Sequence, residues 1–273
     1  MLEGLPSLRD VIAQHGLAAK RSLGQHFLLD PNLLDRIVRA AGELAGRHVV
    51  EVGPGPGGLT RALLGSAAVS VTSVELDDRA VAALQDVIVA AAGRFTLVTG
   101  DALRRDLTAL VPAPRQIIAN LPYNIGAPLL VGWLRQAAAW ERLTLMFQLE
   151  VAERICAAPD TPDYGRLSVL AQWICHTDIA MRVPPEAFVP PPKVTSAIVR
   201  LTPRAEQPPA DLFVAMERLT AAAFGQRRKM LRGSLKALGG EKLLARAEIA
   251  PDRRAETLSV AEFDRLVRQL GTG

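Results

Sequence analysis

The chain has 273 residues, of which 49% are hydrophobic, 22% charged and only 4% aromatic. This length and apolar content predict one large domain with a small second one, and exclude a disordered chain, a collagen and a disulfide scaffold. No run approaches the roughly 18 apolar residues of a membrane-spanning helix. The N-terminus, with Glu3, Arg9 and Asp10, has no signal-peptide core. We therefore expect a soluble, cytoplasmic monomer without a membrane partner.

Charge is distributed unevenly along the chain, although the net charge is only +4. Residues 61–180 contain 10 Lys and Arg against 12 Asp and Glu, whereas residues 200–273 contain 14 against 9. The basic C-terminal part favours a polyanionic partner, with a solvated helical face as the alternative. Cys156 and Cys175 stand apart from each other and from any His cluster. We expect free thiols and no metal site.

The first 46 residues predict two helices with an irregular stretch between them. Ser7 and Asp10 form a capping box for a short helix that ends near Gly16. Residues 16–29 show no periodic pattern. Asp30 and Pro31 then supply an N-cap and a first-turn proline for a second helix.

From residue 47, short apolar runs alternate with helical patterns. Helices are predicted over 59–64, 79–92 and 127–139. The predicted strands are 48–52, 69–74, 95–98, 116–119 and 143–147. Strict alternation of this kind indicates βαβ crossovers and a doubly wound α/β domain with a parallel sheet.

Beyond residue 178 the pattern changes twice. Residues 179–183 and 195–201 predict an antiparallel pair at the edge of the sheet, and 207–209 a proline-containing linker. Helices are expected over 212–224, 227–238 and 260–270. The predicted organisation is an N-terminal segment (1–46), a cofactor-binding catalytic domain (47–204) and a small all-α domain (210–273).

A glycine-rich turn follows the first predicted strand. Gly53 and Gly55 let the backbone turn sharply and approach a ligand where a Cβ would collide. Glu75, at the end of the next strand, is placed to accept hydrogen bonds from ribose hydroxyls. This combination predicts a cofactor site but leaves NAD and S-adenosylmethionine open. Asp101, after the third strand, could accept from an adenine amine or cap a helix.

The tetrapeptide Asn120-Leu121-Pro122-Tyr123 follows the fourth strand. It resembles the (Asn/Asp)-Pro-Pro-aromatic motif of enzymes that methylate exocyclic amino groups of bases. The Asn120 oxygen and the Leu121 carbonyl can accept the two N6 hydrogens of an adenine, and Tyr123 offers a face for stacking. A turn with a buried tyrosine is the alternative interpretation.

Several motifs in order make the resemblance more specific and extend it over residues 20–270. The chain resembles the small-subunit ribosomal RNA adenine dimethyltransferases, which have a Rossmann-like class I S-adenosylmethionine-dependent methyltransferase sheet. The motifs that carry the resemblance are Arg21 to Leu28, Glu51 to Gly55, Asn120 to Ile125, Phe188 to Val194 and Phe224 to Lys229.

The resemblance implies S-adenosylmethionine as the cofactor. His26 and Leu28 match residues that close over the cofactor, and Gly53 and Gly55 match the loop that binds it. Glu75 matches the residue that binds its ribose, and Asp101 matches the one that binds its adenine. Asn120 matches the residue that joins the cofactor site to the target base. The matching catalytic residues are Asn120, Leu121, Tyr123 and Phe188, the last covering the other face of the adenine. A core position for Phe188 is the alternative.

Two positions depart from the family pattern. Position 26 is usually Asn in this family, so the contact of His26 is expected to differ. Gly126 replaces a residue that often carries a hydroxyl, which removes any polar contact from that position.

A basic cluster begins near residue 227. On the predicted helix, Arg228, Arg232 and Lys236 form a stripe at i, i+4 and i+8. Phosphate contacts from such a stripe would weaken steeply with salt, unlike an ordinary solvated helix face. The expected RNA-binding residues are Arg227, Arg228, Lys229, Arg232 and Lys236.

The resemblance implies an enzyme that methylates N6 of two adjacent adenosines in the 3′-terminal hairpin of 16S rRNA, in the 30S particle. One alternative is a 23S rRNA adenine dimethyltransferase of the antibiotic-resistance type. Another is a non-catalytic RNA-binding assembly factor on the same fold. An NAD oxidoreductase is the weakest alternative, because the chain shows no His, Lys or Tyr-Lys arrangement for hydride transfer.

Overall fold

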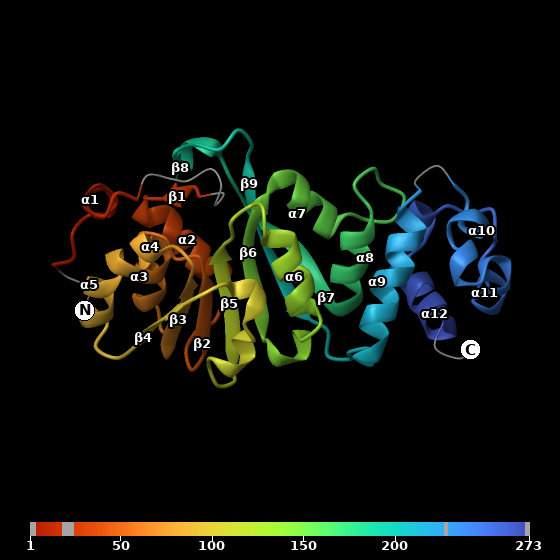
Figure 1. The fold of residues 1–273 in the computed structure, drawn as a ribbon, viewed down its shortest axis with the longest axis horizontal. Helices are drawn as coiled ribbons and strands as arrows, with labels where there is room; N and C mark the ends of the chain where they lie inside the picture. The colour runs from red at the N-terminus through yellow and green to blue at the C-terminus, as the bar shows by residue number, and fades with distance from the viewer. Residues whose placement is uncertain (1–3, 18–24, 227–228, 271–273) are drawn as a thin grey trace. The chain divides into compact units, whose positions relative to one another are not determined.

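Five parallel strands form the centre of a large sheet. The computed structural model describes residues 4–17, 25–226 and 229–270 (Figure 1). The five strands are β2 (His48–Val52), β3 (Ser70–Glu75), β4 (Phe95–Thr99), β5 (Arg115–Asn120) and β6 (Arg142–Gln148). Each pairs in parallel with its neighbours in the order β4-β3-β2-β5-β6. The predicted apolar runs and parallel sheet are confirmed.

Two further strands extend one edge of this sheet. β9 (Ser196–Pro203) pairs antiparallel with β6, and β7 (Cys175–Val183) lies beyond β9. Within the described residues the sheet has seven strands. An ion pair of 2.7 Å joins Arg200 on β9 to Asp178 on β7. The two strands expected at the edge are therefore neighbours there.

The strand order reverses between β2 and β5. From β2 the chain moves outward to β3 and β4, then returns to the other side of β2 for β5 and β6. The connections to either side diverge at this point, which leaves a crevice at the carboxyl ends of β2 and β5. Ligands bind to open α/β sheets in such crevices.

Helices cover the sheet much as the periodicity predicts. The first two are α1 (Leu8–Gln14) and α2 (Pro31–Ala40), with Ser7 and Asp30 as their N-caps. Those between the parallel strands are α3 (Gly58–Leu64), α4 (Asp78–Ala83), α5 (Gln85–Ala90) and α6 (Gly126–Leu134). The single helix expected over 79–92 is thus two helices, which meet at the buried Leu84. Between β4 and β5 lie only the 3₁₀ turns η2 (Ala102–Arg104) and η3 (Leu107–Ala109).

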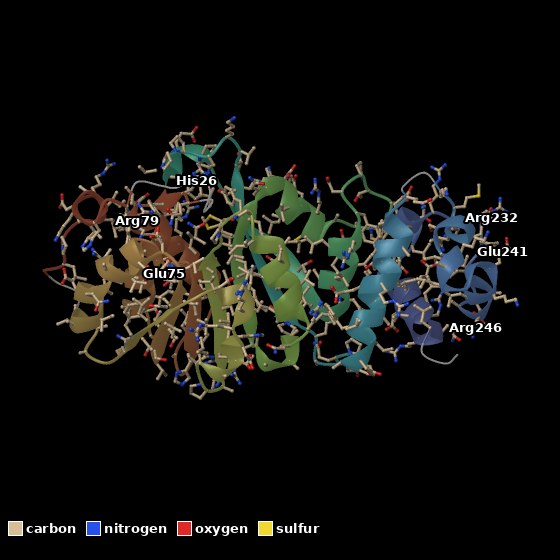
Figure 2. The ribbon with its side chains drawn as sticks, in the orientation of Figure 1. His26, Glu75, Arg79, Arg232, Glu241 and Arg246 are labelled. Atoms are coloured by element: carbon tan, nitrogen blue, oxygen red, sulfur yellow. The ribbon has the colours of Figure 1, made fainter. Side chains whose placement is uncertain are left out.

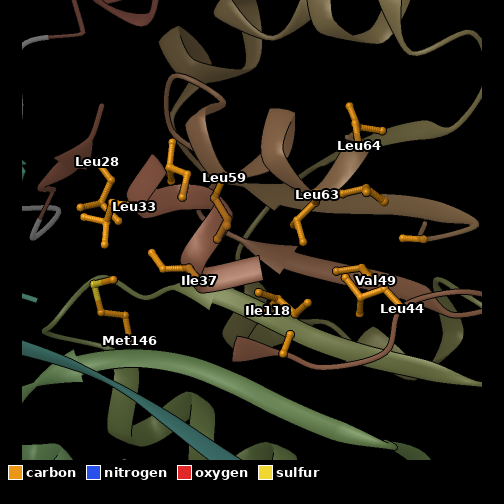
Figure 3. Packing of buried hydrophobic residues seen from close by; sticks show 14 of the residues in the cluster. Leu28, Leu33, Ile37, Leu44, Val49, Leu59, Leu63, Leu64, Ile118 and Met146 are labelled. Carbon is orange, nitrogen blue, oxygen red and sulfur yellow. The ribbon is translucent and has the colours of Figure 1, made fainter. Parts of the chain in front are cut away.

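The main core lies between α2, α3 and the sheet. Leu33 and Ile37 of α2 pack in one cluster with Leu59 and Leu63 of α3 (Figure 3). Ile118 of β5 belongs to the same cluster. This packing fixes the start of α3, and with it the glycine loop that precedes the helix.

A small second sheet joins segments that are distant in sequence. β1 (Phe27–Leu28) pairs antiparallel with β8 (Phe188–Val189). The sequence predicts no strand in residues 16–29, because a strand of two residues has no detectable alternation. The N-terminal segment is therefore attached to the loop after β7, which begins with the 3₁₀ turn η5 (Pro185–Ala187).

The chain divides into two compact units. The first comprises residues 1–152 and 178–202, and the second residues 153–177 and 203–273. After the turn η4 (Ala137–Ala139) and β6, α7 (Leu149–Cys156) leads into the second unit, which contains α8 (Arg166–Ile174). Residues 153–177, expected in the cofactor-binding domain, thus belong to the second unit.

The second unit is helical, as expected. It contains α9 (Asp211–Phe224), α10 (Leu231–Ser234), α11 (Gly240–Arg246) and α12 (Val260–Leu270), with the 3₁₀ turns η6 (Lys236–Leu238) and η7 (Ala255–Thr257). Trp173 of α8 stacks on Phe213 of α9 and donates a hydrogen bond of 2.9 Å to Asp264 of α12. These contacts explain why α8 joins this unit.

The structure corrects the helix expected over 227–238. Met230 is extended at the N-cap of α10, so the helix begins only at Leu231. It ends after four residues, and the chain continues as η6. Gly233 weakens the helix, because glycine is a poor helix former. Arg232 lies on α10 and Lys236 on η6, so these two members of the expected stripe do not share one helix, while Arg228 lies outside the described residues.

Within the described parts of the chain, no helix has both the length and the apolar character needed to cross a bilayer.

Candidate functional site

A crevice lies at the point where the strand order reverses. Its walls come from the carboxyl ends of the parallel strands and from the segment 25–28. The crevice contains nine of the residues expected from the sequence: His26, Leu28, Gly53, Gly55, Glu75, Asp101, Asn120, Leu121 and Tyr123. His26 and Glu75 are labelled in Figure 2. The structure therefore brings together the expected cofactor-binding residues and the expected catalytic loop.

The glycine loop follows β2 and approaches the crevice closely. Gly53 and Gly55 have φ angles of +68° and +54°, which side chains rarely allow. A Cβ on Gly55 would lie 3.0 Å from the Phe27 ring. Glycine at position 55 therefore lets the loop pack closely against Phe27 of β1, and the Gly55 N–H donates to Glu75 Oε2 at 3.1 Å.

Glu75 ends β3 with its carboxylate held by backbone groups. Oε1 accepts from the N–H groups of Leu76 and Asp77, both at 2.8 Å. Burial raises the pKa of Glu75, and the hydrogen bonds from Asp77, Gly55 and Leu76 oppose that rise. A carboxylate has about four acceptor sites, so three bonds leave one, on Oε2, for a ribose hydroxyl.

Asp77 is a second carboxylate beside Glu75, and the sequence patterns did not indicate it. Two hydrogen bonds from Arg79, at 3.0 and 2.6 Å, lower the pKa of Asp77 to about 2. Gln25 donates a further bond of 3.2 Å to the same carboxylate. Asp77 thus ties the N-terminal segment to the sheet at the edge of the crevice.

Asp101 caps a turn, as one of its two expected roles requires, and it also lines the crevice. Its Oδ1 accepts from the Leu103 N–H at 2.9 Å and caps the turn η2, while the residue lines the crevice. Leu76 and Leu103 line the same crevice and are 58% and 47% exposed. Two exposed leucines beside an acceptor form a suitable site for a planar, amine-bearing ring.

Glu51 lies beneath the glycine loop at the end of β2. Its side chain is buried, and Oε2 accepts from the hydroxyls of Thr60 and Ser73, both at 2.7 Å. Burial raises the pKa of Glu51 to about 7, against the effect of these two bonds. The carboxyl group therefore changes its charge near neutral pH.

Asn120 is the last residue of β5 and opens the expected catalytic loop. Its Nδ2 donates to the main-chain oxygen of His26 at 3.2 Å. This bond orients the amide and leaves Oδ1 as its acceptor atom. The loop thus offers an acceptor in the same crevice as Glu75 and the glycine loop.

Tyr123 is fixed at both ends of its side chain. Its hydroxyl shares a hydrogen bond of 2.6 Å with Ser196 of β9. The ring stacks on His26, with 5.4 Å between centroids and 27° between planes. Burial raises the pKa of Tyr123, so the hydroxyl stays protonated at neutral pH. Ser196 gave no sequence signal, since it lies 73 residues away on another strand.

The structure corrects the expected position of Phe188. Its side chain is only 2% exposed and packs in the main core, because β8 pairs with β1 and turns this ring inward. It is not among the residues that line the crevice. The described ring contact of Phe188 is an edge-on one with His26, at 6.4 Å.

Gly126, the second departure from the family pattern, has a steric explanation. It begins α6, and a Cβ there would lie 3.1 Å from the Phe147 ring. With Phe147 in this rotamer, glycine is the residue that fits at position 126.

The expected RNA-binding residues belong to the second unit. Lys229, Arg232 and Lys236 are exposed, and Arg232 is labelled in Figure 2. Arg227 and Arg228 lie outside the described residues. Of the cysteines, Cys175 is buried and Cys156 is partly buried, and the structure shows no disulfide between them.

Comparison with known proteins gives one consistent family. The family model described as Ribosomal RNA adenine dimethylase matches residues 16–271. A protein of Gluconobacter oxydans named ribosomal RNA small subunit methyltransferase A is 64% identical, over 96% of this chain and 86% of its own. A protein of the same name from Rhodospirillum rubrum is 55% identical, over 97% of this chain and 93% of its own.

Two solved structures are similar over most of the chain. A dimethyladenosine transferase from Plasmodium falciparum aligns with a TM-score of 0.75 at 25% identity, over 90% of this chain and 98% of its own. The 23S rRNA methyltransferase ErmE aligns with a TM-score of 0.66 at 28% identity, over 90% and 100%. With a matching family model over nearly the whole length and close relatives of one name, the chain belongs to the ribosomal RNA adenine dimethylase family.

Proposed function

We propose that this protein transfers methyl groups from S-adenosylmethionine to N6 of two adjacent adenosines in the 3′-terminal hairpin of 16S rRNA. The products are N6,N6-dimethyladenosines, formed in the 30S particle in the cytoplasm, where the enzyme acts as a monomer. The observation that carries the proposal is the position of Asn120 and Tyr123. Both line the crevice that also contains Glu75 and the glycine loop.

The residues of the crevice fit this cofactor. Glu75 offers an acceptor for the ribose, and Asp101, with Leu76 and Leu103 beside it, fits the adenine. Gly53 and Gly55 line the same crevice with backbone conformations that side chains rarely allow. When bound, S-adenosylmethionine supplies an electrophilic methyl group. Leu28 and His26 contribute to the wall that excludes water from it.

Asn120 and Leu121 activate the target nitrogen. The lone pair of an adenine N6 is conjugated with the ring, so the amine is a poor nucleophile. The Asn120 Oδ1 and the Leu121 main-chain oxygen accept its two hydrogens and favour a pyramidal nitrogen. Positioning of this kind lowers the barrier without a covalent intermediate. The amine becomes acidic once it is alkylated and loses its proton to water.

Tyr123 holds the extruded base by stacking. Its ring lines the crevice, and Ser196 and His26 fix its orientation. Stacking of a base on an aromatic ring contributes on the order of 1–3 kcal/mol. The exposed basic residues Lys229, Arg232 and Lys236 bind RNA phosphates, together with Arg227 and Arg228.

The proposal predicts that Asn120→Ala abolishes methylation while cofactor binding is largely retained. The measurement uses purified protein, labelled cofactor and immature 30S particles, with mass spectrometry of the adenosines and calorimetry of cofactor binding. Asn32→Ala, on the exposed first turn of α2, is the matched control and should methylate normally. Normal methylation by Asn120→Ala would contradict the assignment of the loop.

One alternative activity has structural support. The 23S rRNA methyltransferase ErmE has a similar fold, and methylation of a 23S rRNA adenine would use the same chemistry at the site. Leu121 and the basic segment from 227 to 229 favour the small-subunit substrate. Parallel assays on 30S particles and on 23S rRNA separate the two, since methyl transfer to 23S rRNA alone would support the alternative.

The remaining alternative is a binding factor without catalysis. The residues expected for catalysis and cofactor binding are present in the crevice, which argues against it. An Asn120→Ala protein that still supported maturation of the small subunit would show that RNA binding is a separate role.

A further inference from the structure

His26 contacts three different parts of the site. Its main-chain oxygen accepts the hydrogen bond from Asn120. Its ring stacks on Tyr123 at 5.4 Å. Its Nδ1 lies 2.9 Å from the main-chain oxygen of Pro190. Because a carbonyl oxygen can only accept, Nδ1 carries the proton in this bond. One residue thus connects both functional side chains of the catalytic loop with the loop after β8.

Tyr123 has two ring faces, and His26 covers one of them. The hydroxyl at the end of the ring is held by Ser196, so the ring is fixed at its tip and on one face. These two contacts come from segments 170 residues apart in the sequence, yet they restrain the same side chain. Tyr123 also lines the crevice, so a base that enters the crevice would stack on the face opposite His26.

We propose that His26 is a positioning residue that presents one face of Tyr123 to the target adenine. The inference rests on the proposed function, and it assigns the side chain a role toward the base in addition to the expected one toward the cofactor. A ring that is already held on one face loses less conformational entropy when a base stacks on its other face. Aromatic pairs of this kind contribute about 0.5–1.5 kcal/mol.

An imidazole combines two properties that the neighbouring groups use. Its N–H donates to Pro190, which holds the ring in place, and its face contacts Tyr123. Asparagine, the usual residue at this position in the family, can donate but has no ring. Phenylalanine has a ring but cannot donate. Substitutions at position 26 can therefore separate the two properties.

The test compares His26→Phe, His26→Asn and His26→Ala with the wild-type protein. The substrates are immature 30S particles, and particles whose target adenosine is replaced by 2-aminopurine, whose fluorescence falls on stacking. We expect His26→Ala and His26→Asn to raise KM for RNA by between about twofold and tenfold, more than kcat falls, and to weaken the quench. His26→Phe should restore most of the quench and of KM. His176→Ala, an exposed histidine of β7, is the control and should match wild type.

A double-mutant cycle gives a second measurement at the same ring. If His26 and Ser196 both restrain Tyr123, the losses from His26→Ala and Ser196→Ala should not add. Additive losses, or equal behaviour of His26→Phe and His26→Ala, would overturn the proposal. So would variants that change cofactor affinity alone, with the RNA parameters unaltered.

The outcomes also separate this inference from the proposed function. A wild-type protein that forms no dimethyladenosine contradicts the function itself. A wild-type protein that methylates 30S particles, with a KM and quench that no His26 substitution alters, contradicts only the positioning role. Thermal unfolding of each variant shows whether a loss of activity reflects a loss of folded protein.

Discussion

At the scale of single residues, the buried carboxyl of Glu51 links stability to pH. Burial raises its pKa from the ordinary 4.5 to about 7 in the folded protein. The folded state therefore holds the proton more tightly than the unfolded state does. The stabilising contribution of the protonated form is complete below pH 4.5 and is lost as the pH rises through about 7.

Replacement of Glu51 by Gln should remove this dependence. Glutamine keeps the shape without the charge, and the Thr60 and Ser73 hydroxyls can reorient toward it. Above pH 7 we expect the variant to exceed wild type in free energy of unfolding by on the order of 3 kcal/mol, with the difference vanishing toward pH 4.5. Urea unfolding at several pH values measures this difference in free energy of unfolding, with Glu186→Gln, at an exposed position, as the control. A difference independent of pH would contradict the shift.

Sequence motifs located most of the crevice but not its supporting residues. Gly55, Glu75 and Asn120 could be predicted because the parallel strands end at one edge of a sheet, and each of these residues lies at or just after the end of a strand. Ser196 and Asp77 could not, since the bonds of Ser196 to Tyr123 and of Asp77 to Gln25 join residues that no periodic pattern links. The sequence left Phe188 between the base and the core, because its burial depends on the pairing of β8 with β1.

At the scale of elements, the length of a segment decided whether the sequence could predict it. The strands of the parallel sheet have five to seven residues and form clear apolar runs. β1 and β8 have two residues each, too few for any period. The spacing of basic residues after residue 227 did not predict the break between α10 and η6.

The basic residues around α10 should determine how RNA affinity depends on salt. Arg232 on α10 is exposed and carries a charge able to contact a phosphate. If it does, Arg232→Ala should reduce the slope of log KM against log salt by roughly 0.7–0.9. Methylation kinetics between low and physiological salt measure the slope. Arg9→Ala, an exposed arginine of α1, serves as control, and parallel plots for wild type and Arg232→Ala would exclude the contact.

At the scale of the whole molecule, the two compact units share one chain that crosses between them more than once. The first unit is interrupted by residues 153–177, which belong to the second. Within the second unit, Trp173 is buried against Phe213 and bonded to Asp264. No single cut therefore separates the two units.

Removal of residues 203–273 should consequently expose an apolar surface on α8. We expect this truncated protein to aggregate or to bind a hydrophobic dye, because Trp173 loses its partners. A second variant, in which a Gly/Ser linker also replaces residues 153–177, should stay dispersed and bind cofactor. Light scattering and dye fluorescence compare the two. If the protein without residues 203–273 stayed soluble and bound no dye, α8 would not need the C-terminal helices to bury its apolar surface.

The pairing of β1 with β8 has a consequence for the order in which the protein is made. His26 and Pro190 are 164 residues apart, and ribosomes add roughly 5–20 residues per second. The segment that closes the crevice therefore leaves the ribosome about 8–30 seconds before its partner strand exists. Until then, β1 has no strand to pair with, and the wall formed by residues 25–28 cannot be complete. The wall of the crevice can thus be completed only after residue 190 of the 273 has been added.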